Sequence, residues 1–267
     1  MTVPVNSETG GAAAQGELWS VRAADWANQE ELQAPIYEAI LDHLGVSTGT
    51  RLLDIACGSG VAVRAAIARG ATAAGIDAAP GLVEIARRRA PGADLRIGSM
   101  EHLPFADDAF DVVTGFNAFQ FADDIVVALR EARRVTRPGG SVAMQVWGRP
   151  EHTEIAALVR AFAPHLPFAL PSGPGGRSLC DAGVLEELAS AAGLEPRVAR
   201  DIACPFDYPD AATLVRTSLG AGLAQLAARI AGEDVIREAI LDAMGPFRNA
   251  DGSYHTDNEW HYLVARA

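Results

Sequence analysis

Two acidic residues and a pair of glycines are the positions of this sequence best suited to hold a ligand. Asp54 lies in a short apolar run, 52–56, which is typical of a buried strand, and Gly58 and Gly60 follow at once. A strand, a glycine turn and a helix form the start of a βαβ unit. Open α/β sheets bind ligands at the carboxyl ends of their strands, so we expect a binding loop here. Glycine lets the backbone bend and a ligand approach it.

A second acid, Asp77, ends the next expected strand, 71–77, seventeen residues after Gly60. A carboxylate at this point can accept hydrogen bonds from both hydroxyls of a nucleoside ribose. It can also cap the helix expected after Pro80. Together with the glycine loop, Asp77 favours ribose binding.

The loop does not match the dinucleotide fingerprint Gly-x-Gly-x-x-Gly, because the third glycine counted from Gly58 falls on Val63. An acid such as Asp54 beside the loop would repel a pyrophosphate, whereas it suits a ligand with a free ammonium group. A nicotinamide-dependent oxidoreductase is therefore a disfavoured alternative.

Three runs of residues resemble class I S-adenosylmethionine-dependent methyltransferases. The order Asp-x-Ala-x-Gly-x-Gly over 54–60 is similar to the first motif of that family, with Ala56 in place of a glycine. The runs 103–113, Leu-Pro-Phe-Ala-Asp-Asp-Ala-Phe-Asp-Val-Val, and 130–140, Arg-Glu-Ala-Arg-Arg-Val-Thr-Arg-Pro-Gly-Gly, also match. The resemblance covers residues 45–148 and is to the ubiquinone/menaquinone-type and natural-product-tailoring members.

This resemblance implies S-adenosylmethionine as cofactor, bound at the ends of the first four strands. Ser99 stands where the family usually has the Asp of its adenine loop, and its hydroxyl can still accept a hydrogen bond. The residues predicted to bind the cofactor are Asp54, Ala56, Gly58, Gly60, Asp77, Ala78, Ser99, Met100, Glu101 and Asn117.

No catalytic base is identified by the sequence. Methyl transfer from a sulfonium mainly requires alignment and exclusion of water, and a base only where the acceptor must lose a proton. The candidates are His152, His165, Tyr254 and His255, for each of which a surface or packing role is favoured. His43 and His261 are expected to be structural.

A small organic acceptor is favoured over a macromolecule. The run 117–120, Asn-Ala-Phe-Gln, lacks the prolines of the Asn/Asp-Pro-Pro-Tyr motif of enzymes that methylate DNA bases or protein glutamine, and it holds no nucleophilic cysteine for cytosine C5 chemistry. The net charge of −12 argues against nucleic acid. Aromatic residues at the expected strand ends suit an apolar or aromatic acceptor, although core packing explains them equally: Phe116, Phe119, Phe121 and Trp147.

Composition narrows the chemistry further. All 22 basic residues are arginine, which excludes a Walker phosphate loop and a Schiff-base lysine. Cys57, Cys180 and Cys204 are too far apart to indicate a zinc site or a disulfide framework, so we predict free thiols and no metal. No apolar run reaches the ~20 residues of a membrane span, so we expect a cytoplasmic protein without membrane contact. A homodimer is compatible with the sequence.

Alternating strands and helices through residue 148 predict an α/β fold with a doubly wound, Rossmann-like sheet. The resemblance implies seven strands, the last antiparallel, with helical cap insertions. We expect a helix in the run 130–140 that stops at Pro138, and a fifth strand over 142–147. Trp19 and Trp26 either anchor the N-terminal arm or cover the ligand. The predicted parts are a disordered tail (1–16), an N-terminal helical arm (17–45), the cofactor-binding core (46–148), a cap insertion (149–180), a helical cap insertion (207–255) and the remaining sheet half (181–206 and 256–267).

The expected function is methyl transfer from S-adenosylmethionine to a small, apolar or aromatic, natural-product-like acceptor. The alternative is a protein of the same fold that binds the cofactor but catalyses a cyclisation or isomerisation. A non-catalytic interaction protein agrees poorly with an intact glycine loop plus Asp77.

Overall fold

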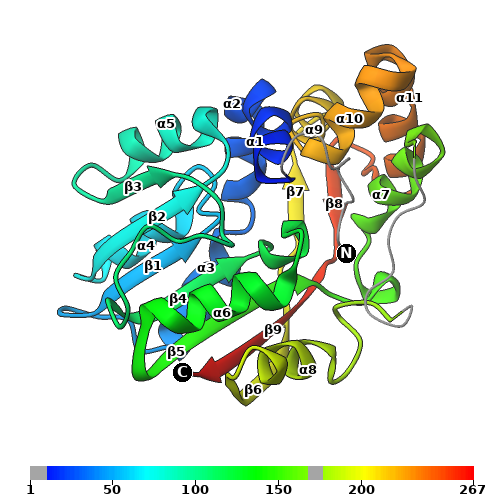
Figure 1. Cartoon of the computed structure of the whole chain (residues 1–267). Helices are drawn as coiled ribbons and strands as arrows, with labels where there is room; N and C mark the ends of the chain where they lie inside the picture. The colour runs from blue at the N-terminus through cyan, green and yellow to red at the C-terminus, as the bar shows by residue number, and fades with distance from the viewer. Residues whose placement is uncertain (1–10, 168–176) are drawn as a thin grey trace.

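A seven-stranded sheet forms the centre of the protein, which is described by a computed structural model for residues 11–167 and 177–267 (Figure 1). The strand order is β3-β2-β1-β4-β5-β9-β6. The first five strands along the chain are parallel, and β9 runs antiparallel to both β5 and β6. The predicted doubly wound sheet with an antiparallel last strand is therefore confirmed. The strands are β1 (Arg51–Ile55), β2 (Thr72–Asp77), β3 (Asp94–Ile97), β4 (Phe110–Phe116), β5 (Thr136–Trp147), β6 (Glu195–Ala203) and β9 (Glu259–Arg266).

Helices cover both faces of the sheet because successive strand residues point to opposite sides. Leu53 of β1 packs in the same buried cluster as residues of α6 (Ile125–Val135) and α8 (Val184–Ala191). Its neighbour Leu52 packs in a different cluster, with residues of α4 (Val61–Ala68) and α5 (Pro80–Arg89). These layers hold the carboxyl ends of β1, β2 and β4 side by side at one edge.

The N-terminal arm consists of α1 (Gly11–Val21), α2 (Ala23–Glu31) and α3 (Ala34–His43). The prediction of a disordered tail is wrong for residues 11–16, which are helical, while residues 1–10 lie outside the described part. Tertiary contacts explain the difference, since an added Cβ on Gly16 would come within 2.1 Å of the Ala78 carbonyl oxygen. Such close packing on the sheet edge stabilises a helix whose glycines alone disfavour it.

The cap contains α7 (Ala156–Phe162), α9 (Ala211–Ser218), α10 (Gly222–Ala231) and α11 (Glu233–Met244). A two-stranded sheet of β7 (Phe206–Tyr208) and β8 (Tyr254–Thr256), which the sequence did not reveal, extends from β6 and β9 toward these helices (Figure 1). Cap residues share one buried cluster with α3 and the sheet, which joins cap and core. Short 3-10 turns lie at η1 (Phe119–Phe121), η2 (Pro150–His152), η3 (Ala163–His165) and η5 (Gly245–Phe247).

One boundary differs from the prediction. Helix α6 ends at Val135, and β5 begins at Thr136, so Pro138 belongs to the irregular start of a strand rather than to the end of a helix. The pairing of β4 with β5 shifts register between Phe110 and Val112, as a bulge requires. Within the described residues, no helix is long and apolar enough to cross a membrane.

Candidate functional site

The glycine loop after β1 has a backbone that ordinary side chains rarely adopt. Ala56, Gly58 and Gly60 have φ angles of 54°, 52° and 83°. A Cβ on Gly58 would lie 2.7 Å from a Glu30 carboxylate oxygen, and one on Gly60 would lie 2.9 Å from the Ala86 Cβ. The two glycines are therefore required by the turn and its packing, whereas Ala56 accepts the strained conformation.

Asp77 supports this loop from the end of β2. Its carboxylate accepts hydrogen bonds from the Gly58 N–H and from the Ala79 N–H, each at 2.8 Å. Burial raises the pKa of Asp77, although these N–H groups act in the opposite direction. Asp77 lines a cavity of about 90 Å³ at the sheet edge together with Ala56, Gly58 and Ala78.

Asp54 lies elsewhere. It is 2 % exposed, and its Oδ1 accepts a hydrogen bond at 2.7 Å from Thr114, its neighbour in register on β4. Burial raises its pKa well above the usual range. It does not belong to the described lining of the cavity, and neither does Gly60.

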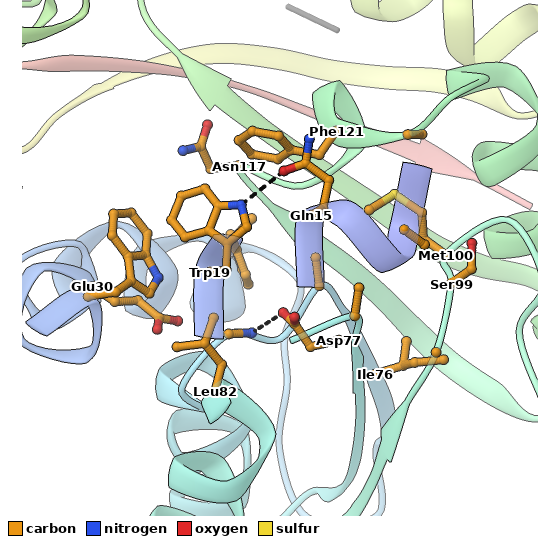
Figure 2. Close-up of a pocket in the computed structure, with 18 of the residues that line it drawn as sticks. Gln15, Trp19, Glu30, Ile76, Asp77, Leu82, Ser99, Met100, Asn117 and Phe121 are labelled. Carbon is orange, nitrogen blue, oxygen red and sulfur yellow. Dashed lines mark hydrogen bonds between the residues drawn. The ribbon is translucent and has the colours of Figure 1, made fainter. Parts of the chain in front are cut away.

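Sequence reasoning missed Glu30, which is 5 % exposed and lines the same cavity. Its Oε2 accepts a hydrogen bond at 2.8 Å from the Ser59 N–H. Burial raises its pKa to about 7. Figure 2 shows Glu30 and Asp77 on the same side of the Trp19 ring. A signal was present, because Trp26, Glu30, Gln33 and Tyr37 recur at helical spacing and all four line the cavity.

The other predicted binding residues also line the cavity; Figure 2 shows Ser99 and Met100 close together and Asn117 apart from them, beside the Trp19 ring. Ser99, Met100 and Glu101 follow β3, and Asn117 follows β4. The Ser99 Oγ accepts a hydrogen bond from the Glu101 N–H at 3.1 Å, and the Glu101 carboxylate accepts one from the Asp124 N–H at 2.7 Å. This loop is thus tied to the start of α6.

A second, larger cavity of about 460 Å³ lies beside the first, between the sheet and the cap. Six uncharged residues line both: Gln15, Trp19, Trp26, Gln33, Asn117 and Phe121. Trp19 and Trp26 contact each other at 4.6 Å between ring centroids, so they cover the cavities as well as anchoring the arm. Of the aromatic residues predicted to contact an acceptor, Trp147 and Phe121 line the larger cavity, whereas Phe116 lines the smaller one.

Polar atoms in the larger cavity are few. Arg160 is the one charged residue among its described lining, and the Gln120 Oε1 and Ser218 Oγ atoms are buried without a hydrogen-bond partner there. Buried polar groups normally have partners, so these two atoms are available to hydrogen-bonding groups of a ligand or to water in this cavity. The remaining wall is mostly apolar, which fits an organic molecule.

The candidate bases are not brought to the site. His152 Nδ1 lies 3.2 Å from the Glu259 carboxylate, and His255 Nδ1 lies 2.7 Å from Asp207, which raises the pKa of His255. Tyr254 packs in the buried core, and His165 lies in η3. None of the four lines either cavity described above. Nor do the described residues contain a cluster of three or more metal-ligating side chains.

Comparison with known proteins agrees with this geometry. Residues 53–144 match the family model for a methyltransferase domain. An uncharacterized protein of Mycobacterium tuberculosis is 33% identical over 186 residues, which are 65% of this chain and 65% of that relative. The demethylmenaquinone methyltransferase of Beutenbergia cavernae is 34% identical over 140 residues, 51% of this chain and 58% of the relative. The chain thus covers less than two thirds of each relative's length.

The fold also has a counterpart among solved structures. A putative methyltransferase of Haloferax volcanii, solved with the Trm112 methyltransferase activator, superposes with a TM-score of 0.61 at 23% identity, over 96% of this chain and 97% of the other. The matched residues include the glycine loop and Asp77 at the end of β2, whereas β6 and β9 lie outside them. Residues 53–144 therefore form a methyltransferase domain, and the comparisons support S-adenosylmethionine as its cofactor.

Proposed function

We propose that the protein transfers the methyl group of S-adenosylmethionine to a small, largely apolar acceptor held in the larger cavity. The observation that supports the proposal is the common wall of the two cavities, across which a ligand at the strand ends would meet a second ligand under the cap. The named activity of the Beutenbergia relative, on demethylmenaquinone, supports an apolar acceptor.

The residues at the sheet edge fit the cofactor chemically. Asp77 would hold the ribose, the loop from Ala56 to Gly60 would hold the amino-acid end, and Ser99 with Met100 would hold the adenine. The bound cofactor supplies an activated methyl group on a sulfonium. Buried carboxylates with raised pKa values suit a ligand that brings positive charge into the site.

The space beside these residues is small for such a ligand. Sites for small molecules are commonly about 300–1,000 Å³, and the cavity measures about 90 Å³. Helix α1 forms part of its wall through Ala12, Gln15 and Trp19. Helix α1 therefore limits the room for a ligand on that side of the cavity.

The common wall also restricts the acceptor. None of its six described residues is titratable, so no side chain there can take a proton from the acceptor. An acceptor atom that is nucleophilic without such help, such as an ionised acidic oxygen, an amine or a stabilised carbanion, fits this wall best. Arg160 provides a positive charge for an anionic acceptor.

The test is to incubate the protein with S-adenosylmethionine and panels of acidic phenols, enols, carboxylic acids and amines. Release of S-adenosylhomocysteine together with a methylated product supports the proposal. Conversion of an acceptor without that release would favour the cyclisation or isomerisation alternative. Failure to bind S-adenosylmethionine at millimolar concentration would reject both.

A cavity-filling variant locates the acceptor. Ala156 lines only the larger cavity, so Ala156→Trp is expected to abolish turnover while leaving cofactor affinity unchanged. The matched control is Ala191→Trp, at the exposed end of α8, which should retain activity. Equal turnover in the two variants would mean that the acceptor binds elsewhere.

A further inference from the structure

Glu30 is a buried acid at the wall of the smaller cavity, and it forms no ion pair with any residue that the structure describes. Among the described residues, no arginine forms an ion pair with it, and Arg89, whose charge acts on it, pairs instead with Glu31 at 3.2 Å. Buried charges are normally paired. The unpaired carboxylate at the cavity wall therefore indicates a cation supplied by the ligand.

Neither of the other two acids is as well placed for this task. Both Asp77 oxygens accept hydrogen bonds from loop N–H groups. Asp54 bonds to Thr114 and lies outside the described cavity lining. Glu30 alone of the three comes from outside the sheet, on α2, and it approaches the loop through Ser59.

The strand order fixes which end of the cofactor meets Glu30. Ser99 follows β3, Asp77 ends β2, and the glycine loop follows β1, and these strands are adjacent in that order. Adenine, ribose and amino acid are connected in the same order in the cofactor. The amino-acid end therefore falls against the loop that Glu30 contacts.

We propose that Glu30 binds the ammonium group of the cofactor's amino-acid end and joins the N-terminal arm to the bound cofactor. The assignment rests on the function proposed above. A carboxylate accepts strong, charge-assisted hydrogen bonds from an ammonium group. The cofactor carboxylate, repelled by the same acids, then turns away from Glu30.

The surroundings of Glu30 make this contact dependent on pH. Burial raises its pKa to about 7, so its charge is incomplete near neutral pH. An ammonium group would lower that pKa and release a proton on binding. Cofactor affinity should therefore increase as the pH rises from 5.5 to 7.5. The charged and titratable groups coupled to Glu30 are Asp77 of β2, Asp54 of β1, Cys57 of the loop, Tyr37 of α3 and Arg89 of α5.

The experiment measures calorimetric affinities of Glu30→Gln for three probes. S-adenosylmethionine carries the ammonium and the sulfonium, S-adenosylhomocysteine keeps only the ammonium, and 5′-methylthioadenosine has neither. The affinity for the first two is expected to fall roughly tenfold to a hundredfold, with the third unchanged and the pH dependence lost. The control is Glu31→Gln on the same helix, whose partners are Arg64 and Arg89.

Other outcomes overturn the assignment in distinguishable ways. Equal weakening for all three probes would mean that Glu30 only holds the arm in place, and weakening for S-adenosylmethionine alone would move it to the sulfonium. Unchanged affinities would remove Glu30 from the site. A wild-type protein that binds none of the probes would reject the proposed function itself. Glu30→Asp guards against a folding defect, because it keeps the charge and should bind both amino-acid probes more tightly than Glu30→Gln does.

Discussion

Removing the Asp77 carboxylate should affect both the folded loop and the cofactor, and the two effects can be measured separately. In Asp77→Ala, the Gly58 and Ala79 N–H groups lose the acceptor that each reaches at 2.8 Å. An unpaired buried N–H costs about 1–3 kcal/mol. Burial disfavours the charge of Asp77, as its raised pKa shows, and this offsets part of the loss. We therefore expect the free energy of unfolding to fall by about 1–3 kcal/mol.

Urea unfolding without cofactor measures the first effect, and titration calorimetry with S-adenosylmethionine measures the second. If the carboxylate also holds the ribose, cofactor affinity should fall by about 1–3 kcal/mol, roughly fivefold to 150-fold. The control is Asp94→Ala on β3, where an exposed pair with Arg96 is lost and stability should change by less than about 1 kcal/mol.

Either half of this reasoning can fail alone. An unchanged unfolding curve would show that the loop amides do not depend on Asp77. A destabilised variant that binds S-adenosylmethionine with wild-type affinity would refute the ribose contact.

Three further perturbations test the loop and the arm. The pKa of Glu30 is raised from 4.5 to about 7, so between these pH values the folded state binds more protons than the unfolded state. The free energy of unfolding without cofactor should therefore fall by about 3 kcal/mol as the pH rises from 4.5 to 7. Urea unfolding of Glu30→Gln should not show this fall. Ala56 has a φ of 54°, so Ala56→Gly should be more stable by up to about 1 kcal/mol, and a lower melting temperature would contradict this. Gly16→Ala places a methyl group against the Ala78 carbonyl and should detach α1, with faster tryptic cleavage at Arg22; Gly245→Ala, which meets nothing within 4 Å, should be cleaved like the wild type.

The sheet half of the fold could be predicted because its signals are local. The apolar run ending at Ile55, the glycines of the turn and the acid ending β2 each specify a strand end without knowledge of the rest of the chain. The cap was predicted less completely from the sequence, because β7 and β8 are three-residue strands that pair across some fifty residues. Helix α1 was missed because its stability comes from the surface beneath it rather than from its own composition.

Site prediction failed where burial decides the role of a polar residue. Glu30 and Glu31 are adjacent and chemically identical, yet one lines the cavity and the other pairs with arginines near the surface. Only the helical spacing from Trp26 to Tyr37 distinguishes them. Asp54 shows the converse, because a position at the end of a strand does not determine which neighbour its side chain bonds.

The wall that separates the two cavities has a thermodynamic consequence. Four residues of the N-terminal arm line both cavities: Gln15, Trp19, Trp26 and Gln33. A ligand in one cavity that orders the arm therefore also orders part of the wall of the other cavity. Linkage then requires each ligand to change the affinity for the other by the same factor. The affinity for the methyl donor would thus depend on whether the acceptor is bound, and the reverse. Transfer of the methyl group would change the affinity for both products and so the rate at which each is released.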